Sequence, residues 1–236
     1  SSRGLGDVYK RQRIDYSILD QHSESYRKIR NTFRYLLGNI NDKFKDINLN
    51  EIEIESLPEL EKFILNKVYL LNKKFETCFH KYDFHNLYKE LLNFCTTDLS
   101  AFYFDIRKDT LYCDPINSEK RKSCVTVLNI LLKSLLRWFA PILSFTTEEI
   151  YQLISKKSKS IHLEKFLKFP EKFKNDKLAE KWSQLMKIRD ICNISIEEQR
   201  ASKEIGSSLE AELNIKLNEK YNCLLYTSDA ADDVIS

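Results

Sequence analysis

Glycine and proline, the residues that most often end helices and form tight turns, are scarce in this chain. Only 4 glycines and 4 prolines occur in 236 residues, which leaves little material for the reverse turns of a β-sheet protein. Apolar residues recur instead at steps of three and four, the spacing that gathers side chains on one face of an α-helix. We therefore expect an all-α protein, an antiparallel helix bundle with a smaller, mostly helical appendage at its C-terminal end.

The segment Ser23–Asp42 shows this spacing clearly. Ser25 is expected to cap its helix, Ile14 to His22 to lead into it, and Gly38 with Asn39 to end it. At about 100° per residue, one side of this helix is apolar and carries Ile29, Phe33, Leu36 and Ile40. The opposite side is cationic with one amide, and it carries Arg27, Arg30, Asn31 and Arg34, with Lys28 at its margin.

Two interpretations of this cationic side remain open at this point. A guanidinium group binds two phosphate oxygens at once, and an asparagine amide can hydrogen-bond to the edge of a base, so the first interpretation is RNA binding. The second is the ordinary solvated face of a surface helix. The spacing alone favours the solvated face.

Further helices are predicted from capping residues and apolar spacing. The first of them begins at a Ser56–Glu59 capping box with Pro58 in its first turn, and the next begins at Asp83 and ends near Ile106. Another begins near Ser118 and ends before Pro141, and a short one begins at a Thr146–Glu149 capping box and ends near Ile154. The last begins near Asp176, and Gly206 ends the final helical stretch. The connections are expected to be a solvated acidic loop over Lys43–Glu55, a turn over Arg107–Pro115 and an irregular lysine-rich stretch over Ser155–Lys177.

Composition excludes several classes of function. The net charge is only +3, so a surface for nucleic acid has to be a local patch. The 6 cysteines include no C-x-x-C pair and the histidines lack metal-ligand spacing, so we expect buried thiols in a reducing compartment and no metal site. No apolar run of about 18 residues and no signal peptide is present, which favours a cytoplasmic protein. No catalytic residues can be nominated.

Four stretches resemble, in order, one known family. They are SESYRKIRNTFRYLLGNIND (Ser23–Asp42), DLSAFYFDIRKDTLYCD (Asp98–Asp114), LLRWFAPILSFTTEEIY (Leu135–Tyr151) and RASKEIGSSLEAEL (Arg200–Leu213). The first three are similar to the anticodon-binding domain of isoleucyl-tRNA synthetase, a class I aminoacyl-tRNA synthetase, and the fourth resembles the segment that follows it. The valyl, leucyl and methionyl enzymes share the helical architecture, but YRKIRNT and DLSAFYFDIRKD favour the isoleucyl branch.

The resemblance implies a tRNA-binding part of isoleucine–tRNA ligase, an enzyme that attaches isoleucine to tRNA(Ile) with ATP. It implies that this chain carries no catalytic residues, no cofactor and no activity of its own. It also implies a monomer with no membrane or DNA partner. The resemblance leaves open whether the intact enzyme carries a zinc-binding module. The alternatives are a helical protein-interaction module and the same domain of a valyl or leucyl enzyme. The candidate tRNA contacts are Arg27, Lys28, Arg30, Asn31, Arg34, Arg107, Lys108, Arg137 and Trp138.

Arg107 and Lys108 are equally well explained by compensation of the helix dipole, whereas for Trp138 core packing is the favoured explanation. The pentamer KKSKS at Lys156–Ser160 differs by one residue from the K-M-S-K-S loop of class I synthetases. Because it follows the bundle helices rather than preceding them, we do not interpret it as a catalytic loop.

The composition also changes along the chain. Residues 1–12 and 223–236 are expected to be a foreign or disordered leader and tail. The leader holds half of the glycines and has no helical period, and the tail turns to alanine and aspartate. Between them we expect the anticodon-binding bundle over residues 13–169 and the helical appendage over 170–222, with the boundary near Pro170.

Overall fold

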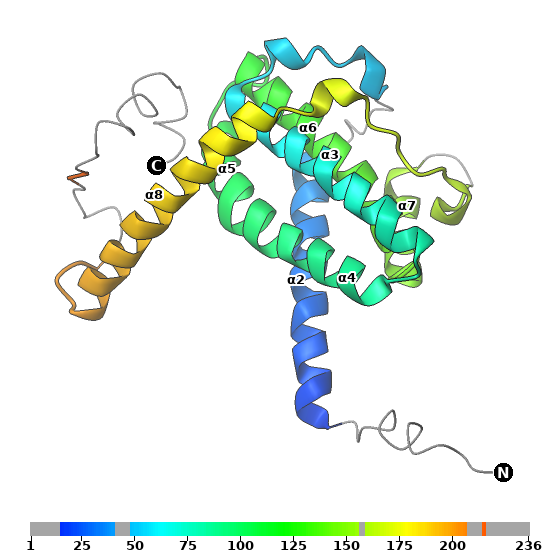
Figure 1. Cartoon of the computed structure of the whole chain (residues 1–236), viewed down its shortest axis with the longest axis horizontal. Helices are drawn as coiled ribbons and strands as arrows, with labels where there is room; N and C mark the ends of the chain where they lie inside the picture. Colours follow the sequence, from blue (N-terminus) through cyan, green and yellow to red (C-terminus); the bar gives the residue numbers. More distant parts are fainter. Residues whose placement is uncertain (1–14, 41–47, 156–158, 207–213, 216–236) are drawn as a thin grey trace.

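The computed structural model describes residues 15–40, 48–155, 159–206 and 214–215. Helices dominate these residues and none of them forms a strand (Figure 1), which confirms the predicted all-α class. No helix in these ranges is both long and apolar enough to cross a membrane. The predicted leader (1–12), tail (223–236) and most of the KKSKS pentamer (156–158) lie outside the described residues.

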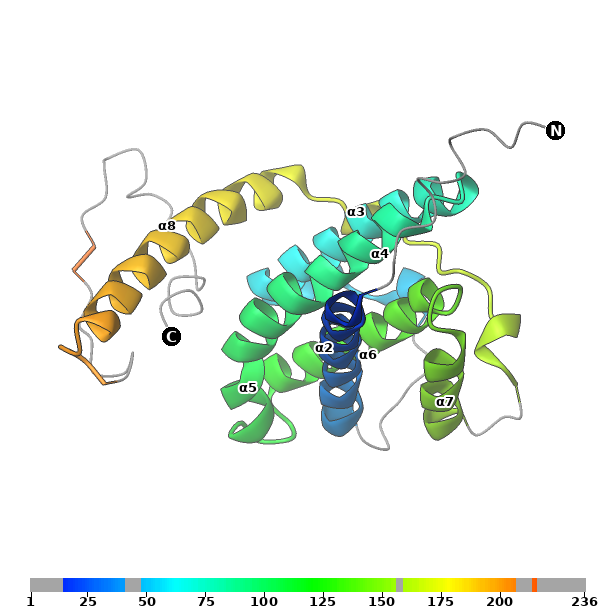
Figure 2. The same cartoon turned by 90° about the horizontal axis from the view of Figure 1, so that it is seen from below.

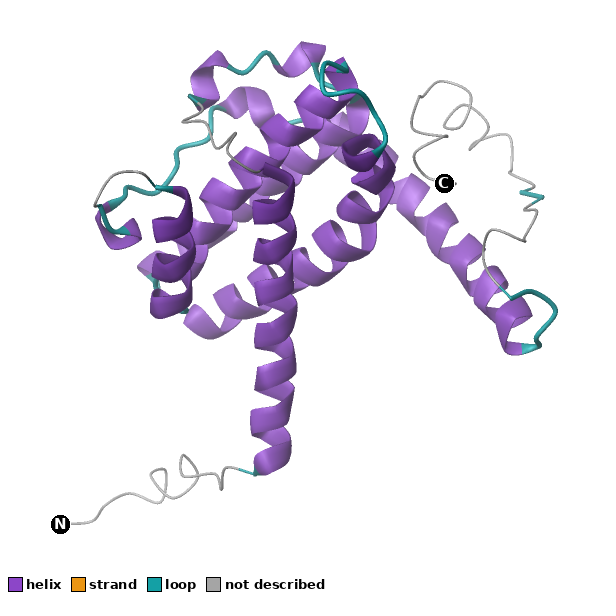
Figure 3. Ribbon diagram, turned by 180° about the vertical axis from the view of Figure 1, so that it is seen from behind, coloured by secondary structure: helices purple, strands orange, loops and turns teal. Residues whose placement is uncertain are grey.

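The first helix, α2 (Tyr16–Ile40), is longer than predicted. Ser25 is not its cap, because the Ser25 hydroxyl donates to the Gln21 carbonyl 2.9 Å away, one turn earlier within the helix. No glycine or proline interrupts the residues before it, so the helix extends back to Tyr16. The predicted apolar side is confirmed as the buried face, with Ile29, Phe33, Leu36 and Ile40 each at most 1% exposed. Beyond this contact the N-terminal half of α2 projects from the bundle (Figures 1 and 3).

The end signals predicted for this helix lie inside it. Gly38 and Asn39 belong to α2, and the Asn39 amide donates to the Tyr35 carbonyl at 2.9 Å. The described part of the following connection is not wholly solvated either. Two short 3-10 turns, η2 (Leu49–Glu51) and η3 (Ile54–Ser56), bury Leu49 and Ile52 at the edge of the core.

The helix α3 (Glu59–His80) is followed by a second long helix that runs back antiparallel to it (Figure 2). Ser56 does not form the predicted capping box, because its hydroxyl donates to the Glu53 carbonyl at 2.8 Å and Pro58 takes the cap position. Asp83 does cap the second helix as predicted, since its carboxylate accepts the amide hydrogen of Asn86.

This second helix does not end near Ile106 as predicted. It continues through α4 (Phe84–Asn93), the π-helical segment η4 (Phe94–Tyr103) and α5 (Phe104–Tyr112). The predicted turn over Arg107–Pro115 is therefore wrong for its first six residues. The sequence holds no glycine or proline from Phe84 to Tyr112 that could end the helix earlier.

The helix α6 (Glu119–Phe139) runs through the middle of the core and packs against α2, α3, α5 and α7 (Ser144–Ile154) (Figure 2). Most of its residues from Val127 onward are buried, including Leu128, Leu132 and Phe139. It ends at Phe139, two residues before Pro141, as the sequence predicts. The Thr146–Glu149 capping box is not formed, since Leu143 precedes α7 and no side chain caps it.

The lysine-rich stretch after α7 is irregular as predicted, apart from the 3-10 turns η5 (Ile161–Leu163) and η6 (Glu171–Phe173). The last helix, α8 (Asp176–Ala201), is capped by Asn175 and packs Trp182 flat on Phe63, with ring centroids 4.9 Å apart. It ends at Ala201, before Gly206, and Lys203 takes a left-handed φ of 61°.

Residues on both sides of the expected boundary at Pro170 belong to one hydrophobic core. Phe169 before it and Phe173 after it form a T-shaped ring pair at 5.6 Å, and Trp182 and Leu185 join the same cluster. Past Arg189, whose guanidinium still lies over the Phe102 ring, α8 extends away from the bundle (Figures 1 and 2), and the predicted apolar positions Cys192 and Ile196 are only half-buried there.

Candidate nucleic-acid interface

The cationic side of α2 faces solvent, because the apolar residues on the other side hold the helix to the core. All five of its predicted polar members are exposed: Arg27, Lys28, Arg30, Asn31 and Arg34. The Arg27 guanidinium lies 2.7 Å from the Glu24 carboxylate, an exposed pair one turn apart on the same helix. Among the described residues, Lys28 and Arg34 have no carboxylate partner. Two of the four cationic groups on this face, Lys28 and Arg34, are therefore uncompensated among the described residues, while Arg27 and Arg30 each have a carboxylate neighbour.

A cluster of polar side chains joins α2 to the start of α7. The Tyr26 hydroxyl lies 2.9 Å from the Thr146 hydroxyl, and Arg30 donates to the same Tyr26 oxygen at 3.2 Å. A second nitrogen of Arg30 lies 3.5 Å from the Glu149 carboxylate. The two residues predicted as a capping box thus bind α2 instead of their own helix. We call this set, Tyr26, Arg30, Thr146 and Glu149, the α2–α7 junction.

The contacts at the junction favour the charged form of both Tyr26 and Arg30. The bonds from Thr146 and then from Arg30 lower the pKa of the Tyr26 hydroxyl below its ordinary value. The bond to Tyr26 and the charge of Glu149 raise the pKa of the Arg30 guanidinium. Arg30 is therefore a positive charge whose guanidinium contacts two neighbours, Tyr26 and Glu149, while staying exposed.

An exposed aromatic ring stands beside this junction. The Phe145 side chain, in the first turn of α7, is 93% exposed. Phe145 and Glu149 are four residues apart, so they share one face of the helix. Glu149 on that face meets Arg30, which places the Phe145 ring on the side of α7 that borders the cationic side of α2. Sequence reasoning missed Phe145, because periodicity does not distinguish an exposed phenylalanine from a buried one.

The structure contradicts the prediction that Arg107 contacts RNA. Its guanidinium is buried and binds the Glu61 carboxylate through two bonds, from Nε at 2.7 Å and from Nη2 at 2.8 Å. The Tyr103 hydroxyl also donates to Glu61, at 3.4 Å, and burial raises the pKa of that hydroxyl well above its ordinary value. Arg107 lies within α5, so compensation of a helix end does not explain it either. Lys108 is exposed and pairs with Asp105 at 3.0 Å.

Two more candidates serve the interior of the protein. Trp138 is 1% exposed, and its indole nitrogen donates to the Asn72 side chain at 3.1 Å, so it packs in the core and offers no stacking plane. Arg137 donates to the Lys165 and Lys133 carbonyls and to the Glu164 carboxylate. With all three guanidinium nitrogens engaged, Arg137 fixes the segment after α7 rather than facing a ligand.

No constellation for metal binding occurs in the residues that the structure describes, where no three histidine, cysteine or acidic side chains gather. The prediction of buried thiols is wrong for Cys113, which is exposed, and Cys78 and Cys192 are only half-buried. The thiols of Cys95 and Cys124 are buried as predicted, and desolvation raises the pKa of each to about 12. These thiols are protonated and chemically quiet at neutral pH.

Comparison with known proteins identifies the kind of domain. Residues 61–215 match a family model described as the anticodon-binding domain of tRNA ligase. The chain is 69% identical over 207 residues to the isoleucine–tRNA ligase of Pelagibacter ubique, a match that covers 88% of this chain and 23% of the relative. It is 40% identical over 205 residues to that of Agrobacterium fabrum and 38% identical over 214 residues to that of Brachyspira hyodysenteriae. The chain spans less than a quarter of the length of these relatives, 23%, 21% and 23% respectively.

Proposed function

Because this chain belongs to the family of anticodon-binding domains of tRNA ligases, we propose that it is the part of an isoleucine–tRNA ligase that binds tRNA(Ile) at the anticodon. The similarity to isoleucine–tRNA ligases over 85% to 95% of the chain supports the isoleucyl enzyme over the valyl and leucyl ones. The helical protein-interaction module, the other alternative, receives no comparable support.

The observation that carries the proposal is the α2–α7 junction. Single-stranded RNA loops are recognised when their bases stack on aromatic or guanidinium planes and bond through their edges, while basic groups hold the backbone. The junction supplies the guanidinium of Arg30, and beside it stands the exposed ring of Phe145. An anticodon loop is a single-stranded target of this kind.

The side chains of this surface divide by chemistry. Phe145 has the exposed ring on which a base can stack, and the Asn31 amide both donates to and accepts from a base edge. Arg34 and Lys28, which have no carboxylate partner among the described residues, suit backbone phosphates. Arg27 can exchange Glu24 for a phosphate at low cost, because exposed ion pairs contribute only about 0–1 kcal/mol.

We assign no chemical step to this chain. In the intact ligase, isoleucine is attached to tRNA(Ile) with ATP, and the residues for that reaction belong to the part of the enzyme that this chain does not include. We propose that the domain acts as a monomer in the cytoplasm, without a membrane or DNA partner and without a cofactor of its own.

Filter binding with two RNAs tests this function. The first is an isoleucine tRNA transcript, and the second is the same transcript with its anticodon replaced. Anticodon recognition predicts that the chain binds the first more tightly, by about 1–3 kcal/mol for each base contact that is lost. Equal affinity for both transcripts would contradict anticodon reading, and no binding to either at low salt would contradict the tRNA-binding function altogether.

A further inference from the structure

A second basic surface lies against the face of α7 next to the one that meets the junction. A hollow of about 470 Å³ is lined by residues 48–50 and by Lys159 with residues 163–168. Three exposed lysines line it, Lys159, Lys165 and Lys168, and none of them has a carboxylate partner among the described residues. The carboxylate in its wall, Glu164, forms an ion pair with Arg137 at 2.8 Å and accepts a hydrogen bond from the Tyr151 hydroxyl at 2.9 Å. We call these residues the lysine hollow.

The backbone of the lysine hollow is held at several points although it is irregular. Glu148 on α7 accepts from the Ser160 hydroxyl at 2.8 Å and from the Ile161 amide at 3.0 Å. Arg137 on α6 donates to the Lys165 carbonyl at 2.8 Å. These bonds fix the segment that carries the lysines, so a ligand orders only the side chains themselves.

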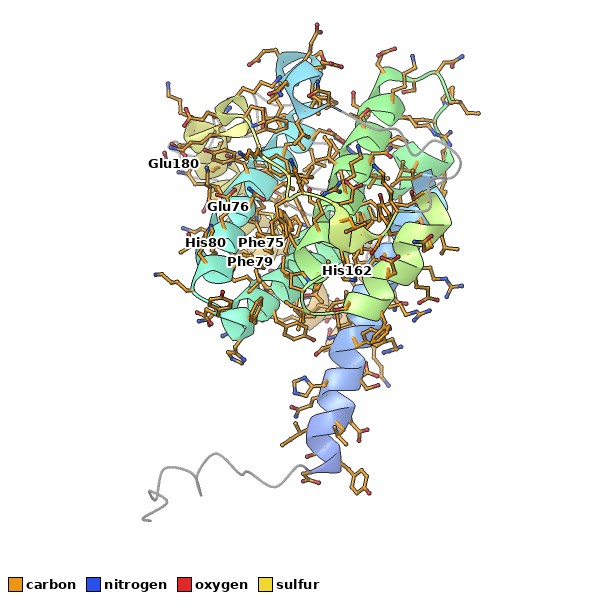
Figure 4. The ribbon with its side chains drawn as sticks, turned by 90° about the vertical axis from the view of Figure 1, so that its right-hand side faces the viewer. Phe75, Glu76, Phe79, His80, His162 and Glu180 are labelled. Carbon is orange, nitrogen blue, oxygen red and sulfur yellow. The ribbon has the colours of Figure 1, made fainter. Side chains whose placement is uncertain are left out.

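Aromatic packing holds one wall of the hollow, and hydrogen bonds from Lys172 hold the opposite wall. The Phe166 ring lies 5.0 Å from both Phe75 and Phe79 of α3, and Figure 4 shows those two rings on the side of α3 that faces the middle of the molecule. The opposite wall is fixed by Lys172, which donates to the Asn50 carbonyl at 2.8 Å and to the Ile52 carbonyl at 2.7 Å. The hollow is thus a formed feature with uncompensated positive charge.

Its position links it to the junction. Figures 2 and 3 both show α7 between α2 and the segment that follows α7. One face of α7 meets α2 through Glu149, and the adjacent face meets the lysine segment through Glu148 and Gln152, whose amide donates to the Lys159 carbonyl at 3.2 Å. The two basic surfaces therefore flank neighbouring faces of a single helix, whose diameter with side chains is about 10–12 Å.

We propose that the lysine hollow binds backbone phosphates of the same RNA whose loop lies at the α2–α7 junction. Lysine ammonium groups act as point charges that suit phosphates, and three such charges without acidic partners favour a polyanion. An RNA hairpin that places its loop at the junction has further phosphates within one helix width. This inference rests on the proposed function but assigns a separate, sequence-independent contact.

Salt dependence of RNA binding tests the lysine hollow. The variant K159Q/K165Q/K168Q removes its three charges at exposed positions, and K89Q/K177Q/K187Q, at exposed lysines on α4 and α8, removes the same net charge elsewhere. Each lost phosphate contact lowers the slope of log K against log salt by about 0.7–0.9. We expect the hollow variant to lose about 2 from this slope and to bind on the order of 100-fold more weakly at about 0.1 M salt, equally for both anticodons. The control variant should keep most of the wild-type slope.

The outcomes separate this inference from the proposed function. If wild-type protein prefers its anticodon but the hollow variant keeps the full slope, the lysine hollow is not an RNA site and the function stands. If both transcripts bind equally but the hollow variant loses slope, the hollow binds RNA and anticodon reading fails. If a polyglutamate peptide shifts the methyl signals of Leu163 and Leu167 in an NMR titration while RNA does not, the hollow binds acidic protein and our assignment is wrong.

Discussion

Replacing Arg107 decides whether this arginine contacts RNA, as its sequence context suggested, or holds the core together. In Arg107→Met the Glu61 carboxylate, 0% exposed, loses both guanidinium bonds and remains buried without its counter-charge. Breaking one partner of a buried ion pair costs about 3–5 kcal/mol. With a urea dependence of about 1–3 kcal/mol per molar, the unfolding midpoint should fall by on the order of 2 M.

The matched variant removes both charges together. In Glu61→Leu/Arg107→Met neither charge of this pair is left buried without its partner, and such replacements are often neutral or stabilising. We therefore expect its free energy of unfolding, measured by urea titration with circular dichroism, to lie within about 1 kcal/mol of the wild type. Because Arg107 is buried, this folded double variant should bind tRNA with the wild-type salt slope. A normal stability for Arg107→Met, or a reduced slope for the double variant, would refute the reasoning.

Three further predictions concern the surface and the thiols. Phe145→Ala should weaken tRNA binding by about 1–3 kcal/mol, the value of one stacked base, without changing the unfolding midpoint because the ring is 93% exposed; Phe145→Tyr should retain binding, and equal loss in both would argue against stacking. Arg30→Ala should lower the salt slope by about 0.7–0.9, and an unchanged slope would remove Arg30 from the interface. In native protein at neutral pH, iodoacetamide should modify the exposed Cys113 and spare Cys95 and Cys124, whose raised pKa of about 12 suppresses the thiolate; rapid modification of all three would contradict their burial.

Hydrophobic spacing was a reliable guide to the fold of this chain. The apolar side of α2 and the helix cores of α3, α4 and α6 follow from residues at three- and four-residue steps, and the solvent side of α2 follows by exclusion. Helix ends were harder to predict. Ser25, Ser56 and Thr146 all stand at capping spacing, but none of their hydroxyls caps a helix. The Ser25 and Ser56 hydroxyls donate to nearby backbone carbonyls, and the Thr146 hydroxyl hydrogen-bonds to Tyr26 of another helix.

At the candidate site, too, local sequence did not predict which side chains are exposed. Arg30 was predicted on a helix and Arg107 in the turn after one, yet both lie on helices in the structure. Their partners, Glu61 in the core and Glu149 at the surface, show which of the two solvent can reach. Similarly, Trp138 and Phe145 lie seven residues apart in one stretch, yet the first is buried and the second exposed. The packing of α6 and α7 against the other helices produces this difference in exposure, and it cannot be predicted from the residues around Trp138 and Phe145 alone.

Photo-crosslinking from position 145 tests the central claim most directly. The benzophenone amino acid p-benzoylphenylalanine, placed at Phe145, reacts with groups that lie against it, and the exposed ring accommodates the change without repacking. We expect irradiation with isoleucine tRNA to yield cross-links that map to the anticodon loop, and we expect free anticodon hairpin RNA to compete them away. Cross-links confined to other parts of the tRNA, or none under conditions where the tRNA is bound, would contradict the placement of the anticodon loop at the α2–α7 junction.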